Sequence, residues 1–442
     1  MPAPVAPASP AHLPASFDAF TKGSPASVMA RGTVERFLNP EFLDKGFQAD
    51  AAGQDTREVF FFTLVHLTAN VVIGSRKSVR ASFAATPEQM GEWLVAVYQE
   101  LEKKDPATSA ALVRYASAEA ASTIRVFHGE PQPLLEGHHV KVLDGSYLAS
   151  CQRRIKGLKA GPLPGQSLVV LDPALRLPLD VFPCEDGPEQ ERALLPDVLA
   201  IVKAKDVWIA DRNFCTRDFL VGIAARQGFF IIRQHRDLPT RDVTELEPAG
   251  EGPAGKFFEQ QVAVLQEDGE EKVLRRVLVK VDTQTRDADD HIAILTNLSP
   301  EVDAPRIGSL YSDRWTIETV FQNLVMHLRS EIDTLGYPKA ALFGSCAALV
   351  CYIVMAVLKG ALEAVHGPGT IPNLSNYYFA DEIERIELGM MIAIPDEHWK
   401  VFHRLTQAEF ALLILALAGA VDMRRFQKAP ASSRKKQPER LD

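Results

Sequence analysis

The pattern of apolar and polar positions changes along the chain. Between about residues 31 and 130, apolar side chains recur at helical spacing, most clearly in TREVFFFTLVHLTANVV (56–72) and EQMGEWLVAVYQELEK (88–103). This spacing predicts a helical N-terminal region. From about residue 138 the period becomes that of short strands bounded by Gly, Pro and Asp, in HHVKVLDGSYLA (138–149), SLVVLDPALRLPLDVFP (167–183), DVWIADRNF (206–214) and GFFIIRQH (228–235).

Two helices are predicted among these strands. Residues 188 to 204 carry apolar side chains at helical spacing, and residues 216 to 226 predict a helix with Thr216 as its N-cap. The order is then strand, strand, strand, helix, strand, helix, strand. This order indicates an α/β fold with a mixed sheet covered by helices.

The second half of the chain begins with an all-β insertion. Residues 240 to 300 contain strand-like runs separated by DG and DADD turns, whereas helical spacing returns over 311–329, 340–365 and most of 370–422. We divide the chain into a disordered Pro/Ala-rich leader (1–30), a helical N-terminal domain (31–135), an α/β core (136–239 and 301–365), a β-rich insertion (240–300), a helical C-terminal region (366–422) and a basic tail (423–442).

Composition narrows the class of protein. The chain has 442 residues, of which 46% are hydrophobic and 24% charged, as in ordinary globular proteins. Its five cysteines are odd in number and lack a C-x-x-C spacing, so they indicate neither a disulfide framework nor a zinc site. The N-terminal stretch has no basic region followed by an apolar core, which argues against a signal peptide. We expect a cytoplasmic protein.

One segment has the length and composition of a membrane helix. Residues 340 to 358 contain no charged side chain. They also include Gly344, Ser345 and two cysteines, and they follow closely on a charged helix. A buried helix in a large core is the interpretation we favour, with no membrane association.

The charge distribution bears on nucleic-acid binding. A net charge of -9 counts against a simple nucleic-acid binder, because phosphate neutralisation needs clustered Lys and Arg. The helical N-terminal region has one basic stretch, SRKSVR (75–80). There are also two larger basic clusters. For each of them, a solvated face or chain end is as good an explanation as nucleic-acid binding. These clusters are Arg153, Arg154, Lys156 and Lys159, and Arg424, Arg425, Lys428, Arg434, Lys435, Lys436 and Arg440.

Three carboxylates are candidates for chemistry. Asp144 ends the apolar run VKVL, and Asp211 ends VWIA. Aspartates at the ends of neighbouring strands can converge on a divalent cation, although such residues are also common in turns. Glu318 lies within the apolar helix RWTIETVFQNL, where an acid is costly unless it is paired or metal-bound. A salt bridge to Arg314, four residues earlier, is the simpler alternative.

Several ordered motifs together resemble DDE transposases of the insertion-sequence-four type. They are LDGSYLA, IADRNF, the strand TNL, Y-x-x-R-W-x-I-E-x-x-F on a helix, and LGYPKAALF, spread over about residues 138 to 360. Tyr311, Arg314 and Glu318 match the family's Tyr, Arg, Glu, Lys signature. The lysine position, seven residues after Glu318, holds Val325, and Arg329 follows one turn later.

The resemblance implies a fold, a site and partners. It implies an RNase-H-like core interrupted by a β-rich insertion, with Asp144, Asp211 and Glu318 as catalytic, metal-binding residues for Mg²⁺ or Mn²⁺, two ions in all. Tyr311, Arg314 and Arg329 would contact DNA. The partners would be the terminal inverted repeats of the element and target DNA, bound by a homodimer, with the helical N-terminal domain recognising the ends.

Two other functions stay open from the residues alone. An RNase-H-like nuclease that cuts without joining would share the three carboxylates. An inactive DNA-binding relative is suggested by the missing lysine and the acidic net charge.

Overall fold

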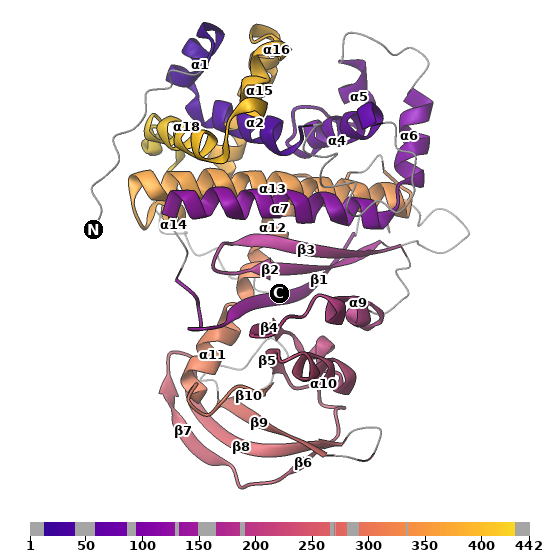
Figure 1. Ribbon diagram of the computed structural model, residues 1–442, viewed down its shortest axis with the longest axis vertical. Helices are drawn as coiled ribbons and strands as arrows, with labels where there is room; N and C mark the ends of the chain where they lie inside the picture. Colours follow the sequence, from indigo (N-terminus) through magenta and orange to yellow (C-terminus); the bar gives the residue numbers. More distant parts are fainter. Residues whose placement is uncertain are drawn as a thin grey trace, which may run out of the picture.

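The computed structural model describes residues 13–39, 58–85, 94–128, 132–148, 165–185, 191–265, 269, 271–280, 291–332 and 335–428 (Figure 1). The chain forms a ten-stranded sheet with helices on both faces and a large helical assembly beyond one end of it. The basic cluster at residues 153–159 and the tail beyond residue 428 lie outside the described residues.

The N-terminal helices begin earlier than the sequence predicted. The disordered leader was expected to reach residue 30, but residues 15 to 30 are largely helical. Phe17 is fully buried against Trp399, with 4.8 Å between ring centroids. Two features explain this difference. The segment carries apolar side chains, such as Phe17, that become buried, and Pro25 is favoured in the first turn of a helix. The helices are η1 (Ala15–Phe17), α1 (Asp18–Gly23), α2 (Pro25–Phe37), α4 (Glu58–Val72), α5 (Val79–Ala84), α6 (Leu94–Lys103) and α7 (Pro106–His128).

The predicted α/β order is confirmed in the core. It consists of β1 (His139–Tyr147), β2 (Gln166–Asp172), β3 (Leu177–Cys184), η2 (Glu191–Leu194), α9 (Leu195–Ala200), β4 (Asp206–Ala210), η3 (Arg212–Phe214), α10 (Arg217–Ala225) and β5 (Phe229–Arg233). The strands lie in the order β3-β2-β1-β4-β5. β2 is antiparallel to both β3 and β1, whereas β1, β4 and β5 are parallel. This is the expected RNase-H-like mixed sheet.

Side chains of the core strands alternate between two buried faces. In β1, Val142 packs with the large core that contains α11, α12 and α13, whereas Leu143 packs with α9 and α10. In β4, Ile209 packs with the first of these two cores and Trp208 packs with the second. A strand that is apolar on both sides must be covered on both sides. Polar side chains follow this double core where the pairing of β1 with β4 ends, after Leu143 and Ala210.

The β-rich segment continues the same sheet. Its strands are β6 (Thr240–Asp242), β7 (Glu247–Gly252), β8 (Gly255–Leu265), β9 (Glu271–Lys280) and β10 (His291–Thr296). β10 pairs antiparallel with both β5 and β9, so the insertion is joined edge to edge to the core. It fills the lower part of the view in Figure 1.

The helix predicted over residues 311–329 is two helices. α11 (Ala304–Ser312) ends just before Asp313, and α12 (Trp315–His327) begins after Arg314. The amide of Arg314 donates to Tyr311 O, and that of Thr316 donates to Asp313 O, so short three-residue turns replace regular helical bonds here. Tyr311 and Glu318 consequently lie on different helices, with Arg314 at their junction.

The long apolar helix is a core helix. α13 (Pro338–His366) has the length and composition to span a membrane, but most of its middle is buried in the protein. It lies beside α7, and the two cover the end of the sheet that carries β3 (Figure 1). The remaining helices are α14 (Thr370–Asn373), α15 (Asn376–Ala393), α16 (Asp396–Trp399), α17 (Val401–Arg404), α18 (Gln407–Gly419) and η4 (Met423–Phe426).

Candidate active site

The pairing of β1 with β4 brings two aspartates together. Leu143 and Ala210 are register partners in this parallel pair, and each is followed directly by an aspartate. Asp144 and Asp211 therefore lie at the same level of adjacent strands. Asp211 directly follows the end of β4, as predicted. The predicted strand end at Asp144 is wrong, because β1 continues to Tyr147 through its pairing with β2. Asp144 Oδ1 accepts a hydrogen bond of 2.9 Å from the amide of Gly145, which leaves its other oxygen for a second partner.

That second partner is Arg314, which joins Asp144 to Glu318. Arg314 Nη1 lies 3.4 Å from Asp144 Oδ2, and Nη2 lies 2.9 Å from Glu318 Oε1. The salt bridge from Arg314 to Glu318 considered from the sequence is therefore present, and it extends to the aspartate. The kink between α11 and α12 places the guanidinium there. The fold thus brings a strand and a helix from distant parts of the chain into one site.

Burial and nearby charges strongly shift the pKa of Asp144. Burial raises the pKa of Asp144 to about 6, and the nearby charges of Asp211 and Glu191 add to this shift. The Gly145 amide and the Arg314 guanidinium oppose it by stabilising the charged carboxylate. A buried carboxylate that repels its neighbours gains the most from a bound cation, and oxygen donors suit Mg²⁺ or Mn²⁺.

The donor chemistry fits divalent ions, but the side chains are not gathered around one metal position. Within the described ranges, no group of three His, Cys, Asp or Glu side chains stands close enough to hold an ion. The Arg314 guanidinium lies between Asp144 and Glu318. Coordination by all three carboxylates would require this guanidinium to move.

Tyr311 supports the arginine from a buried position. Its side chain is 8% exposed, and burial raises its pKa to about 12, with Asp211 adding to the shift and Arg314 opposing it. Arg314 also makes a side-chain hydrogen bond that lowers the Tyr311 pKa. A ring so covered suits a role in positioning Arg314 better than the direct contact with DNA that the signature implied.

A fourth carboxylate lies next to the same part of β1. Glu191, in η2, lies so close to the main chain of Gly145 that a Cβ atom at this position would collide with Glu191 Oε1. Asn213, two residues after Asp211, donates to Glu191 Oε2 at 2.5 Å. Sequence reasoning missed Glu191 because only the fold places η2 against β1. The glycine after Asp144 was its one sequence signal.

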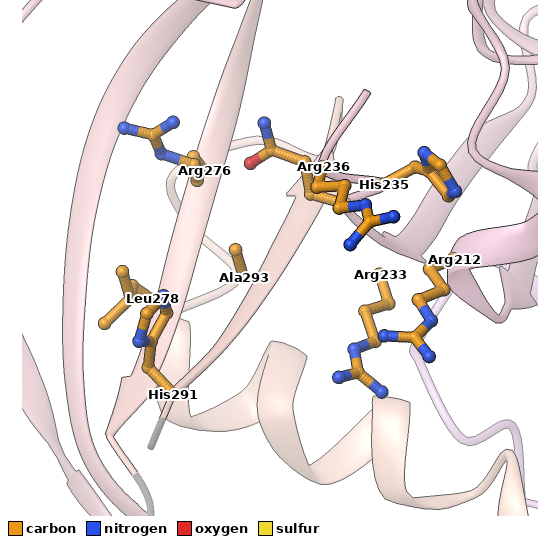
Figure 2. Close-up of a pocket in the computed structure, with 9 residues that line it drawn as sticks. Arg212, Arg233, His235, Arg236, Arg276, Leu278, His291 and Ala293 are labelled. Atoms are coloured by element: carbon orange, nitrogen blue, oxygen red, sulfur yellow. The ribbon is translucent and has the colours of Figure 1, made fainter. Parts of the chain in front are cut away.

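A basic pocket opens next to Asp211. Its volume is about 710 Å³, and it lies where the end of β5 meets β9 and β10. Arg212 directly follows Asp211, and the charge of Arg233 reaches Tyr311. Figure 2 shows its cationic and imidazole side chains around one hollow. They are Arg212, Arg233, His235, Arg236, Arg276 and His291.

The lysine position of the signature lies on α12, and Arg329 follows the end of this helix. Val325 is 57% exposed, and Arg329 forms an ion pair of 3.1 Å with Glu384 of α15. Trp315 is 61% exposed, and the Arg314 guanidinium lies 5.3 Å from its ring centre. In the tail, Arg424 pairs with Asp422 at 2.8 Å, so part of that basic cluster is bound to the protein's own acids.

Comparisons with known proteins agree on one kind of domain. Residues 139–351 match the family described as "Transposase DDE domain". Over 160 residues the chain is 25% identical to a protein of Sinorhizobium fredii (strain NBRC 101917 / NGR234) named "Putative transposase y4zB". This match covers 35% of the chain and 43% of that protein, so the chain spans less than half of its relative.

A solved structure is similar over a greater length. It is that of the piggyBac transposase synaptic complex with hairpin DNA, at 10% identity and a TM-score of 0.41, over 86% of this chain and 85% of the other. The expected similarity to a DDE transposase domain is confirmed by the family match to residues 139–351. The insertion-sequence-four type stays a prediction.

Proposed function

We propose that this protein is a transposase that cleaves DNA at the ends of a mobile element and joins the freed ends to target DNA, with Asp144, Asp211 and Glu318 as its catalytic residues. The observation that supports this most directly is the arrangement around Arg314. It connects Asp144 to Glu318, and strand pairing sets Asp211 beside Asp144. These residues all lie in the part of the chain that matches the transposase domain.

The three carboxylates would hold divalent ions, two Mg²⁺ or Mn²⁺ in all. When bound, such ions polarise a phosphate and activate the attacking oxygen. Asp144 is central, since it neighbours both other acids. Arg314, with a planar fork of donors, suits a phosphate oxygen once a metal takes over the carboxylates. Tyr311 would hold Arg314 in this position.

Recognition and assembly follow from the same proposal. The DNA partners would be the inverted repeats at the element ends and the target DNA, with a homodimer pairing the two ends. The helical N-terminal domain is our candidate for end recognition. Arg329 would make a further DNA contact once it is released from its ion pair with Glu384. The domain boundaries given above, and a cytoplasmic location at the nucleoid, belong to this proposal.

The test uses a labelled element end and a target plasmid. Asp144→Ala, Asp211→Ala and Glu318→Ala should each abolish Mg²⁺-dependent cleavage and joining while leaving end binding largely intact. Glu301→Gln, at an exposed turn before α11, is the control. Cleavage without joining by the wild type would identify a nuclease instead. Near wild-type cleavage by any alanine variant would remove that residue from the site.

A further inference from the structure

The pocket beside Asp211 is a concentration of positive charge on an acidic protein. The chain has a net charge of -9, yet four arginines and two histidines gather around one hollow of about 710 Å³ (Figure 2). These side chains come from η3, from the end of β5 and its following loop, and from β9 and β10. No stretch of sequence contains them together, so only the joining of β10 to β5 creates the pocket.

Two of the pocket's arginines lie next to the candidate active site. Arg212 is bonded directly to Asp211 in the chain, and Arg233 lies close enough to Tyr311 for its charge to lower the pKa of that phenol. A DNA strand whose phosphates bind these arginines would therefore run toward Asp211. Arg236 is accessible, with 91% of its side chain exposed, and its Nε lies 3.6 Å from Asp237 Oδ1. Arg276 pairs with Asp242 at 2.8 Å, so bound DNA would replace these carboxylates with phosphates.

We infer that this pocket binds successive phosphates of the DNA strand that enters the active site, through its backbone and without reading the bases. This inference rests on the proposed function and specifies the path of its substrate. Guanidinium forks match phosphate geometry, and phosphate contacts position a strand without carrying sequence information. The other lining groups, Gln234, Leu278 and Ala293, offer a single side chain able to hydrogen-bond a base edge.

The test measures DNA binding in EDTA, so that it does not depend on cleavage. Fluorescent duplex ends of equal length and different sequence are titrated at several salt concentrations with wild type, Arg233→Ala, Arg236→Ala and the double variant. Each lost phosphate contact should reduce the slope of log affinity against log salt by about 0.9, equally for all sequences. Arg236→Lys should retain its slope, because the charge is kept.

The control is Arg226→Ala, which removes an exposed arginine at the end of α10, outside the pocket. Unchanged slopes in the pocket variants, with wild-type DNA binding intact, would overturn the inference while leaving the proposed function in place. Conversely, reduced slopes in a protein that never cleaves DNA would support the pocket and refute the chemistry. Equal competition by pyrophosphate and by oligonucleotides of increasing length would also overturn it, since that identifies a site for a small anion.

Discussion

Arg314 Nη1 lies 3.4 Å from Asp144 Oδ2, although 170 positions separate the two residues in the chain. The same guanidinium bonds Glu318, four residues after it. Its positive charge stabilises two acids that would otherwise repel each other across the site. Arg314 and a cation therefore compete for the same carboxylates.

This competition gives a prediction for Arg314→Gln. The variant should bind Mn²⁺ more tightly at pH 8, because the carboxylates lose their internal counter-charge. It should nevertheless cleave DNA more slowly, because the fork that would contact phosphate is gone. Electron paramagnetic resonance of free Mn²⁺ measures the first effect, and single-turnover cleavage at saturating metal measures the second. Arg226→Gln is the matched control, and weaker Mn²⁺ binding by Arg314→Gln would contradict the competition.

The free energy of unfolding should depend on pH through the ionisation of Asp144. Its pKa is raised to about 6 in the folded protein, whereas an unfolded aspartate titrates at about 3.9. A raised carboxylate pKa stabilises the fold below the unfolded pKa, and this contribution is lost as pH rises through about 6. Relative to Asp144→Asn, the wild type should thus lose on the order of 2 to 3 kcal/mol between pH 4 and pH 8.

Urea unfolding without metal at both pH values measures this difference. The Asp144→Asn variant should be the more stable of the two at pH 8, and the two proteins should differ less at pH 4. Asp218→Asn, which changes an exposed carboxylate on α10, should show no such pH-dependent gain. An Asp144→Asn variant that is less stable than wild type at pH 8 would show that the carboxylate is not strained by burial.

Replacing Glu191 should change the pKa of Asp144. Its negative charge contributes to the raised pKa of Asp144, so Glu191→Gln should lower that pKa. The pH at which cleavage reaches half of its maximum on the acidic side should then fall. The amide of the substituted side chain retains an oxygen that can accept from Asn213, so the packing of η2 on η3 is preserved. A cleavage profile that keeps its acidic midpoint would show that the charge of Glu191 does not reach Asp144 in solution.

The sequence predicted the proximity of these side chains better than the elements that surround them. Strand runs ending in Asp144 and Asp211 are local signals, and one pairing of β1 with β4 suffices to unite them. Arg314 and Glu318 lie one turn apart, so their contact is local as well. Arg314 reaches Asp144 because the helix is interrupted between α11 and α12. The apolar spacing instead predicted one continuous helix over this region.

Long-range pairing accounts for what the sequence could not show. Glu191 reaches Gly145 from a short 3-10 helix, and the basic pocket exists because β10 pairs with β5. Trp315 belongs to the apolar pattern of its helix, but the helix presents that position outward. Apolar periodicity indicates which face of a helix is buried without fixing the place of every side chain at its edge, and it carries no information on which distant strands meet.

The last prediction concerns the lysine that the signature would place at Val325. This position is 57% exposed on α12, so Val325→Lys can be accommodated without disturbing the core. If the α12 face contacts DNA, the new lysine should add one phosphate contact and steepen the salt dependence of end binding by about 0.9. Arg329→Ala should have little effect, because Arg329 is paired with Glu384 at 3.1 Å. Glu384→Gln, which releases Arg329, should then strengthen binding in the same way as the lysine. A loss of slope in Arg329→Ala, with no gain in Val325→Lys, would mean that Arg329 already makes the contact. No change in any of the three variants would mean that this stretch of α12 does not touch DNA.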